Sequence, residues 1–145
     1  RVFALERWVD DTFFPRFYAP VFWGIPANRE RAIALFKETT RMSSLESYLL
    51  PRVAGVMMRD LIARAQSDLY RLAATLDEFE SRLGGGPFLG ELGQASLADV
   101  SAFAAMSVVT DADFEGAERL RERPAIQDWM ARVRPLTSPG TRLFR

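Results

Sequence analysis

Residues 96–109 read SLADVSAFAAMSVV, and this stretch decides the fold. A serine followed three places later by an acidic residue is the pattern of a capping box, so Ser96 and Asp99 are predicted to cap the N-terminus of a helix. Nearly every other side chain in the stretch is apolar or small, which predicts a helix without a solvated face. We therefore expect residues 97–109 to form the buried central helix of the domain.

A long helix is predicted upstream, from about Met57 to Leu83. Its apolar residues recur at intervals of four or three and form one stripe: Leu61, Ala65, Leu69, Leu72, Leu76, Phe79 and Leu83. The sequence Gly-Gly-Gly-Pro at 84–87 ends this helix. It is not a phosphate loop, because it lacks the Gly-Lys-Ser/Thr ending and follows a helix rather than preceding one.

Two further helices are predicted after the central one. The first is short and lies around 114–123. The second begins at Pro124 and ends at Pro135, and its inward-facing side chains are Ile126, Trp129, Met130 and Val133. The tail beyond Pro135 should be loosely held.

The first third of the chain is rich in aromatic residues. Residues 1–18 are predicted to be helical with a kink near Asp11, because Pro15 cannot donate a hydrogen bond one turn back. A loop is expected from Ala19 to Pro26. A helix capped by Asn28 should run to about Met42, and 43–50 should be helical up to Pro51.

No convincing strand pattern occurs anywhere in the sequence. The predicted fold is all-α, a bundle of about five to six helices around the buried central helix, in one domain that spans residues 1–145.

Composition excludes several classes of function. The 145 residues carry 19 basic and 19 acidic side chains, so the net charge is zero and neither nucleic acid nor an anionic membrane is an expected partner. No apolar run approaches the length of a membrane span. The chain has no cysteine and no histidine, which excludes thiolate nucleophiles, imidazole bases and Cys/His zinc sites. We assign no catalytic residue and no metal site.

The order of these motifs resembles the C-terminal helical domain of glutathione S-transferases, and the resemblance covers essentially the whole chain. It rests on the end of the long helix, on Gly86-Pro87-Phe88-Leu89-Gly90, on the Ser96–Asp99 cap, and on the late helix from Pro124 through Trp129 to Val133. Two earlier segments are similar to a bacterial subgroup of the family, namely Trp8 with Asp11-Thr12-Phe13-Phe14-Pro15, and Asn28-Arg29-Glu30-Arg31-Ala32.

The resemblance implies a cytoplasmic detoxification enzyme that conjugates glutathione to apolar electrophiles and forms a homodimer. In that family a thioredoxin-like N-terminal domain binds glutathione and supplies the residue that stabilises its thiolate, while the helical domain provides a wall of the electrophile pocket. This sequence contains no βαβ pattern, so we interpret it as the second domain of a longer protein. Alone, it is not expected to catalyse the conjugation.

Candidate substrate-binding residues lie on the first helix. Seven large aromatic residues fall between positions 8 and 23, more than one core-facing stripe needs. The resemblance places the first helix beside the electrophile, which implies Trp8, Asp11, Thr12 and Tyr18 as pocket residues. Spacings of three, four and seven put Trp8, Asp11 and Thr12 near one helix face, together with Tyr18 if the helix continues past Pro15. The alternative, in which the rings only form core and interface, stays open.

Two other functions also stay open. The same fold serves as a non-catalytic interaction module in translation, stress-response and import assemblies. A free-standing helical binding domain is the other alternative.

Overall fold

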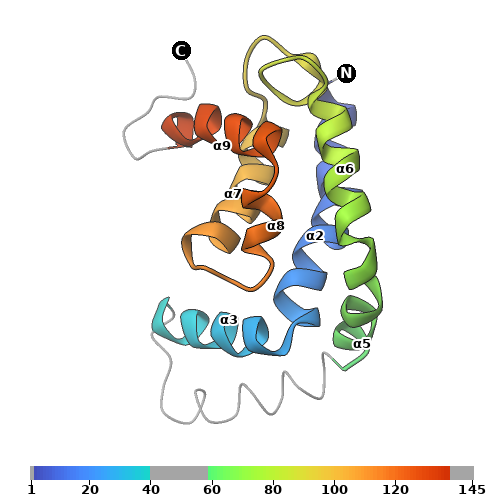
Figure 1. The fold of residues 1–145 in the computed structure, drawn as a ribbon, viewed down its shortest axis with the longest axis vertical. Coiled ribbons are helices and arrows are strands. Elements are labelled where there is room, and N and C mark those ends of the chain that lie inside the picture. The colour runs from blue at the N-terminus through green and yellow to red at the C-terminus, as the bar shows by residue number, and fades with distance from the viewer. Residues whose placement is uncertain (1, 40–58, 138–145) are drawn as a thin grey trace.

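The computed structural model describes residues 2–39 and 59–137. Within them the helices form six continuous segments, and the one pairing of extended residues joins Phe88 to Leu92. The predicted all-α bundle is confirmed. Figure 1 shows α2 and α6 side by side along one flank, α7, α8 and α9 together on the other, and α3 and α5 below.

The first segment runs without a break through α1 (Val2–Trp8), the π turn η1 (Val9–Phe13), α2 (Phe14–Ala19) and the π turn η2 (Pro20–Gly24). The predicted irregularity near Asp11 takes the form of η1, in which the backbone N–H of Phe14 donates to the carbonyl of Val9. Since Pro15 has no N–H for the Asp11 carbonyl, widening the turn lets the helix continue past the proline.

The predicted loop from Ala19 to Pro26 is wrong, because the chain stays helical as far as Gly24. Tertiary packing holds η2 in place: Pro20, Val21 and Phe22 are buried, and α5 (Arg59–Asp68) lies directly against it. A Cβ at Gly24 would lie 2.8 Å from the Ala65 carbonyl oxygen, so only glycine fits there. The helix then ends at Ile25, which is extended as expected before a proline.

The helix α3 (Pro26–Thr39) begins two residues before the predicted cap. Asn28 is therefore not an N-cap. Its buried side-chain amide donates to the carbonyls of Val21 (2.9 Å) and Glu115 (2.8 Å), and its Oδ1 accepts from the Glu115 N–H (2.8 Å). The predicted end near Met42 and the predicted helix over 43–50 lie outside the described residues.

The long helix consists of α5, the 3-10 turn η3 (Leu69–Arg71) and α6 (Leu72–Leu83). Most of its predicted stripe is buried, but Leu69 is half-buried and Leu61 is exposed. Gly84 ends the helix with a φ of 56°, a conformation that favours glycine. The predicted start at Met57 falls outside the described range. A short 3-10 turn, η4 (Leu89–Glu91), then leads towards α7.

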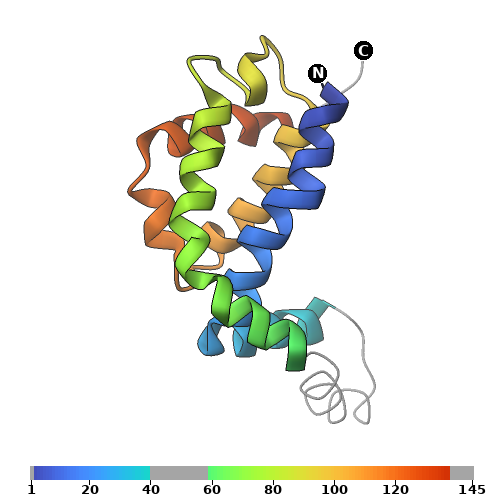
Figure 2. The same cartoon turned by 90° about the vertical axis from the view of Figure 1, so that its right-hand side faces the viewer.

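The helix α7 (Leu97–Asp111) is the central element, as predicted: it packs against α1, α2, α8 (Ala117–Arg121) and α9 (Pro124–Thr137). Figure 2 shows it behind the pair formed by the first segment and α6. The expectation that it lacks a solvated face is wrong. Leu97 is 60% exposed, Val108 is 44% exposed, and Ala104 between them is also exposed.

In α9 the predicted inward residues Ile126, Trp129, Met130 and Val133 are all buried. The helix does not end at Pro135 but continues to Thr137. Because this proline lies in the last turn, it removes only one terminal hydrogen bond, and the Thr137 hydroxyl donates to the Arg134 carbonyl at 3.0 Å. The tail from residue 138 lies outside the described residues.

Candidate functional site

Ser96 and Asp99 meet at the N-terminus of α7, where Asp99 is completely buried. Its Oδ2 accepts from the backbone N–H of Ser96 (2.9 Å) and from the Ser96 hydroxyl (2.8 Å). Its Oδ1 accepts from the Leu89 N–H (2.9 Å) and from the indole N–H of Trp129 (2.8 Å). One carboxylate thus joins three parts of the bundle: the start of α7, the turn η4 and the helix α9.

This arrangement has the geometry of structural support rather than of a reactive centre. Both oxygens of Asp99 are occupied by donors, and the carboxylate has no exposed surface from which to reach a ligand. The four hydrogen bonds satisfy a buried charge that would otherwise be very costly.

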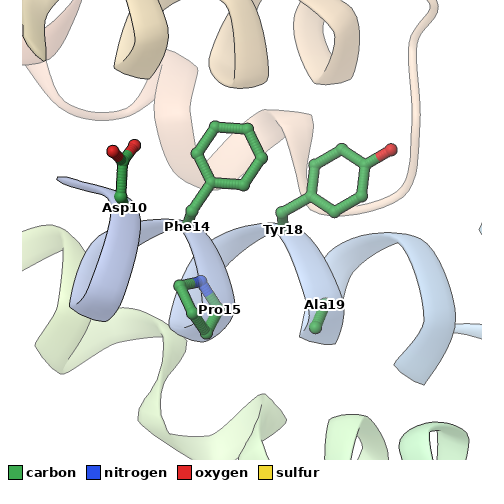
Figure 3. A pocket seen from close by; sticks show the side chains of 5 residues that line it. All are labelled: Asp10, Phe14, Pro15, Tyr18 and Ala19. Atoms are coloured by element: carbon green, nitrogen blue, oxygen red, sulfur yellow. The ribbon is translucent and has the colours of Figure 1, made fainter.

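An open depression of about 320 Å³ lies on the first segment and is lined by Asp10, Phe14, Pro15, Tyr18 and Ala19. We call it the α1–α2 groove. Figure 3 shows Asp10, Phe14 and Tyr18 projecting from the same side of the helix, whereas Pro15 and Ala19 do not project from that side. The rings of Phe14 and Tyr18 stack at 5.4 Å, and Tyr18 stacks on Phe22 at 4.1 Å.

The π turn brings these three side chains into line. In a regular α-helix, residues eight apart drift off one face, because 3.6 residues complete a turn. A π turn takes in about one extra residue, which rotates all later residues by about 100° relative to the earlier ones. With η1 between them, positions 10, 14 and 18 share a face.

The same rotation separates two of the predicted pocket residues, Trp8 and Tyr18. Trp8 is buried against α6, where its ring lies 6.2 Å from that of Phe79 and its indole N–H donates to Glu78 Oε1 at 2.8 Å. The Arg82 guanidinium covers the Trp8 ring at 4.2 Å. Tyr18 lies instead in the α1–α2 groove.

The other two predicted residues are not in the groove: Asp11 is exposed, Thr12 is half-buried, and neither lines the depression. Sequence reasoning missed Asp10 and Phe14. Positions 10, 14 and 18 follow at successive intervals of four, and this spacing would have indicated a shared face only if the wide turn had been known.

Tyr18 has a phenol whose pKa is shifted by its surroundings. Partial burial raises the pKa of its phenol above the usual value of 10.0. The hydroxyl therefore stays protonated at neutral pH and can donate a hydrogen bond. It cannot serve as a general base there.

Two kinds of site are absent from the part of the chain that the structure describes. No group of three or more acidic side chains there is arranged to hold a metal ion. None of its helices has the length and apolar character needed to cross a bilayer.

Comparison with known families identifies the domain. The family model for the glutathione S-transferase C-terminal domain matches residues 59–132, about half of the chain, from the start of α5 into α9. No curated protein and no solved structure matches the chain. The matched span contains the long helix, the Asp99 cap and most of the helix that carries Trp129, whereas the two earlier segments that are similar to a bacterial subgroup lie outside it. The chain therefore belongs to the glutathione S-transferase C-terminal domain family.

Proposed function

We propose that this domain forms one wall of the electrophile-binding pocket of a glutathione-conjugating enzyme, and that the wall is the α1–α2 groove. The observation that carries the proposal is the pair of stacked, half-buried rings of Phe14 and Tyr18 on an open surface. Half-exposed aromatic surface is available to an apolar ligand, whose burial there is favourable.

All described residues that line the groove belong to the first helical segment, which fits a pocket completed by another domain. A thioredoxin-like domain outside these residues would bind glutathione and supply the group that stabilises its thiolate. The described part of the groove contributes a phenol and a carboxylate as binding groups, and we assign stabilisation of the thiolate to the other domain. The role proposed for this domain is therefore binding and orientation of the second substrate, with the chemistry performed elsewhere.

The exposed face of α7 supports the presence of such a domain. Leu97, Ala104 and Val108 follow one another at intervals of seven and four, so they form an apolar stripe on one side of the helix. Solvated apolar stripes are characteristic of surfaces that another unit covers. We propose that the thioredoxin-like domain packs on this stripe and that the intact enzyme is a homodimer in the cytoplasm.

The experiment uses the complete translated reading frame that contains this chain. Conjugation of glutathione to an aryl chloride, 1-chloro-2,4-dinitrobenzene, is measured while each substrate is varied in turn. Phe14→Ala removes apolar surface from the groove, and the KM for the aryl chloride should rise about five- to tenfold. The KM for glutathione should change by less than about twofold, because glutathione is bound elsewhere.

Tyr70→Ala is the matched control, since Tyr70 is a 72% exposed aromatic residue on η3, outside the groove. It should leave both KM values unchanged. Equal effects of the two substitutions would contradict the assignment of the groove. A wild-type protein that neither binds glutathione nor conjugates it would contradict the enzyme function and favour the interaction module.

A further inference from the structure

We propose that the α1–α2 groove selects ligands by charge, and that it prefers a flat apolar group carrying a fixed positive charge over its neutral or anionic counterpart. This inference rests on the proposed function for the location of the binding site. It adds a substrate class, organic cations, that follows from Asp10 and the two rings beside it.

The first observation is the order of groups along the groove. Asp10, Phe14 and Tyr18 lie at successive intervals of four on one side of the helix (Figure 3). A carboxylate therefore stands at one end of a row of stacked rings. A planar ligand lying on Phe14 and Tyr18 would bring a charged substituent within reach of Asp10. Ring faces attract cations, and a nearby carboxylate adds to that attraction.

The second observation is that the charge of Asp10 is not compensated. Asp10 is exposed. Among the residues that the structure describes, none donates a hydrogen bond to its carboxylate or forms an ion pair with it. Within that described part of the chain, Asp10 is also the one charged residue that lines the groove. A carboxylate already paired with a cation would give the groove no preference for charged ligands. The charge preference therefore depends on Asp10 having no such partner.

Arg7, one turn before Asp10, is exposed and forms no ion pair with it among the described residues, and two later arginines have other partners. Arg16 pairs with Glu78 of α6 at 3.7 Å. Arg31 lies over the Phe114 ring at 5.7 Å and donates to the Asp113 carbonyl at 3.2 Å. Neither guanidinium lines the groove. Because no described basic side chain lines the groove, an anionic ligand would meet no cation within the groove, and a cationic ligand would meet no competitor for Asp10 there.

The test compares three probes of similar shape on the complete translated reading frame that contains this chain. These are (2-naphthylmethyl)trimethylammonium as the cation, 2-naphthylmethanol as the neutral probe and 2-naphthylacetate as the anion. Binding is followed by NMR through the ring resonances of Phe14 and Tyr18. The Kd of the cation should be about fivefold lower than that of the neutral probe, and the anion should bind more weakly than either.

Asp10→Asn is the decisive variant and Asp11→Asn is its matched control. Both remove one negative charge from adjacent, exposed positions, but only Asp10 lines the groove. Asp10→Asn should bring the cation and neutral Kd values to within about twofold of each other. Asp11→Asn should retain most of the preference, because its charge lies outside the groove and is screened by solvent.

The possible results separate this inference from the proposed function. If the neutral probe shifts the Phe14 and Tyr18 resonances but the cation binds no better, the charge preference is overturned and the pocket wall stands. If Asp11→Asn weakens the preference as much as Asp10→Asn does, general surface charge is responsible and the inference fails. If no probe shifts these rings, both proposals fail together.

Discussion

Asp99 on the central helix and Asp10 on the first helical segment differ in burial and in their hydrogen-bond partners. Asp99 is fully buried and both of its oxygens are occupied by donors from the start of α7, from η4 and from α9. Asp10 is exposed, stands at the end of an aromatic row and pairs with nothing in the described residues. The first is built to hold the bundle together, and the second is available to a ligand.

The comparison shows how environment sets the role of an identical side chain. Burying a carboxylate is energetically unfavourable unless donors satisfy its hydrogen-bonding capacity. A buried aspartate such as Asp99 therefore connects the several elements that supply those donors. Water solvates an exposed carboxylate, so it needs no protein partner for stability. Its charge can then attract a cationic ligand or repel an anionic one. The predictions below test this contrast, beginning with the largest effect.

Replacing the buried carboxylate should have the greatest consequence. Asp99→Ala leaves the N–H groups of Leu89, Ser96 and Trp129 without their acceptor, and each buried unpaired donor costs about 1–3 kcal/mol. We expect a loss of at least about 3 kcal/mol in the free energy of unfolding and a fall of about 10 °C in Tm. Urea and thermal unfolding measure both. Asp10→Ala should change the unfolding free energy by less than about 0.5 kcal/mol, and similar losses in the two variants would remove the contrast.

Trp129→Phe removes one donor to Asp99 and leaves the others in place. The lost indole also opens space beside Phe79 and Phe103, whose rings lie 4.9 Å and 6.4 Å from that of Trp129. The unfolding free energy should fall by about 2 kcal/mol, less than for Asp99→Ala. Should denaturant unfolding give the same loss for both variants, the contacts of Asp99 to η4 and Ser96 would contribute nothing.

Ser96→Ala sharpens the account of the cap, because it removes the hydroxyl but keeps the backbone N–H that also binds Asp99. A loss of about 1 kcal/mol is expected, as is typical of N-cap replacements. Amide hydrogen exchange should show the loss as faster exchange in the first turn of α7. Unaltered exchange there would mean that the hydroxyl does not stabilise the helix.

Asp111 is intermediate between the two aspartates, being exposed but paired with Arg134 at 3.0 Å. That pairing holds the pKa of Asp111 below its usual 3.8, chiefly through the hydrogen bond from Arg134. A lowered folded-state pKa stabilises the fold above the ordinary pKa, and the contribution disappears as the pH falls through the lowered value. Because the pair is solvated, Asp111→Asn should reduce the difference in unfolding free energy between pH 7 and pH 3 by less than about 0.5 kcal/mol. A reduction of several kcal/mol in acid titrations of stability would contradict this.

The parts of the fold that depend on local pattern could be predicted from the sequence. The buried stripe of α6, the inward residues of α9 and the meeting of Ser96 with Asp99 all follow from spacing within one helix. The additional partners of Asp99 could not be predicted, because Leu89 and Trp129 are brought to it only by tertiary packing.

The errors have the same physical origin. The helical state of 20–24 depends on contact with α5, and the role of Asn28 depends on Glu115, far away in sequence. The apolar composition of α7 suggested a helix without a solvated face. Composition does not specify, however, whether residues of this chain pack on every apolar face of the helix. At the groove, the π turn η1 changes which residues share a helix face. A prediction based on the regular period of about 3.6 residues cannot reveal such a turn.

The most direct measurement of where an apolar ligand binds is chemical-shift mapping of the 145-residue chain with 2-naphthylmethanol. Two apolar surfaces compete for the probe, the α1–α2 groove and the exposed stripe of α7. The account predicts that the largest changes occur at the Phe14 and Tyr18 rings and the Ala19 methyl group. Changes centred on the methyl groups of Leu97 and Val108, with Phe14 and Tyr18 unmoved, would contradict it.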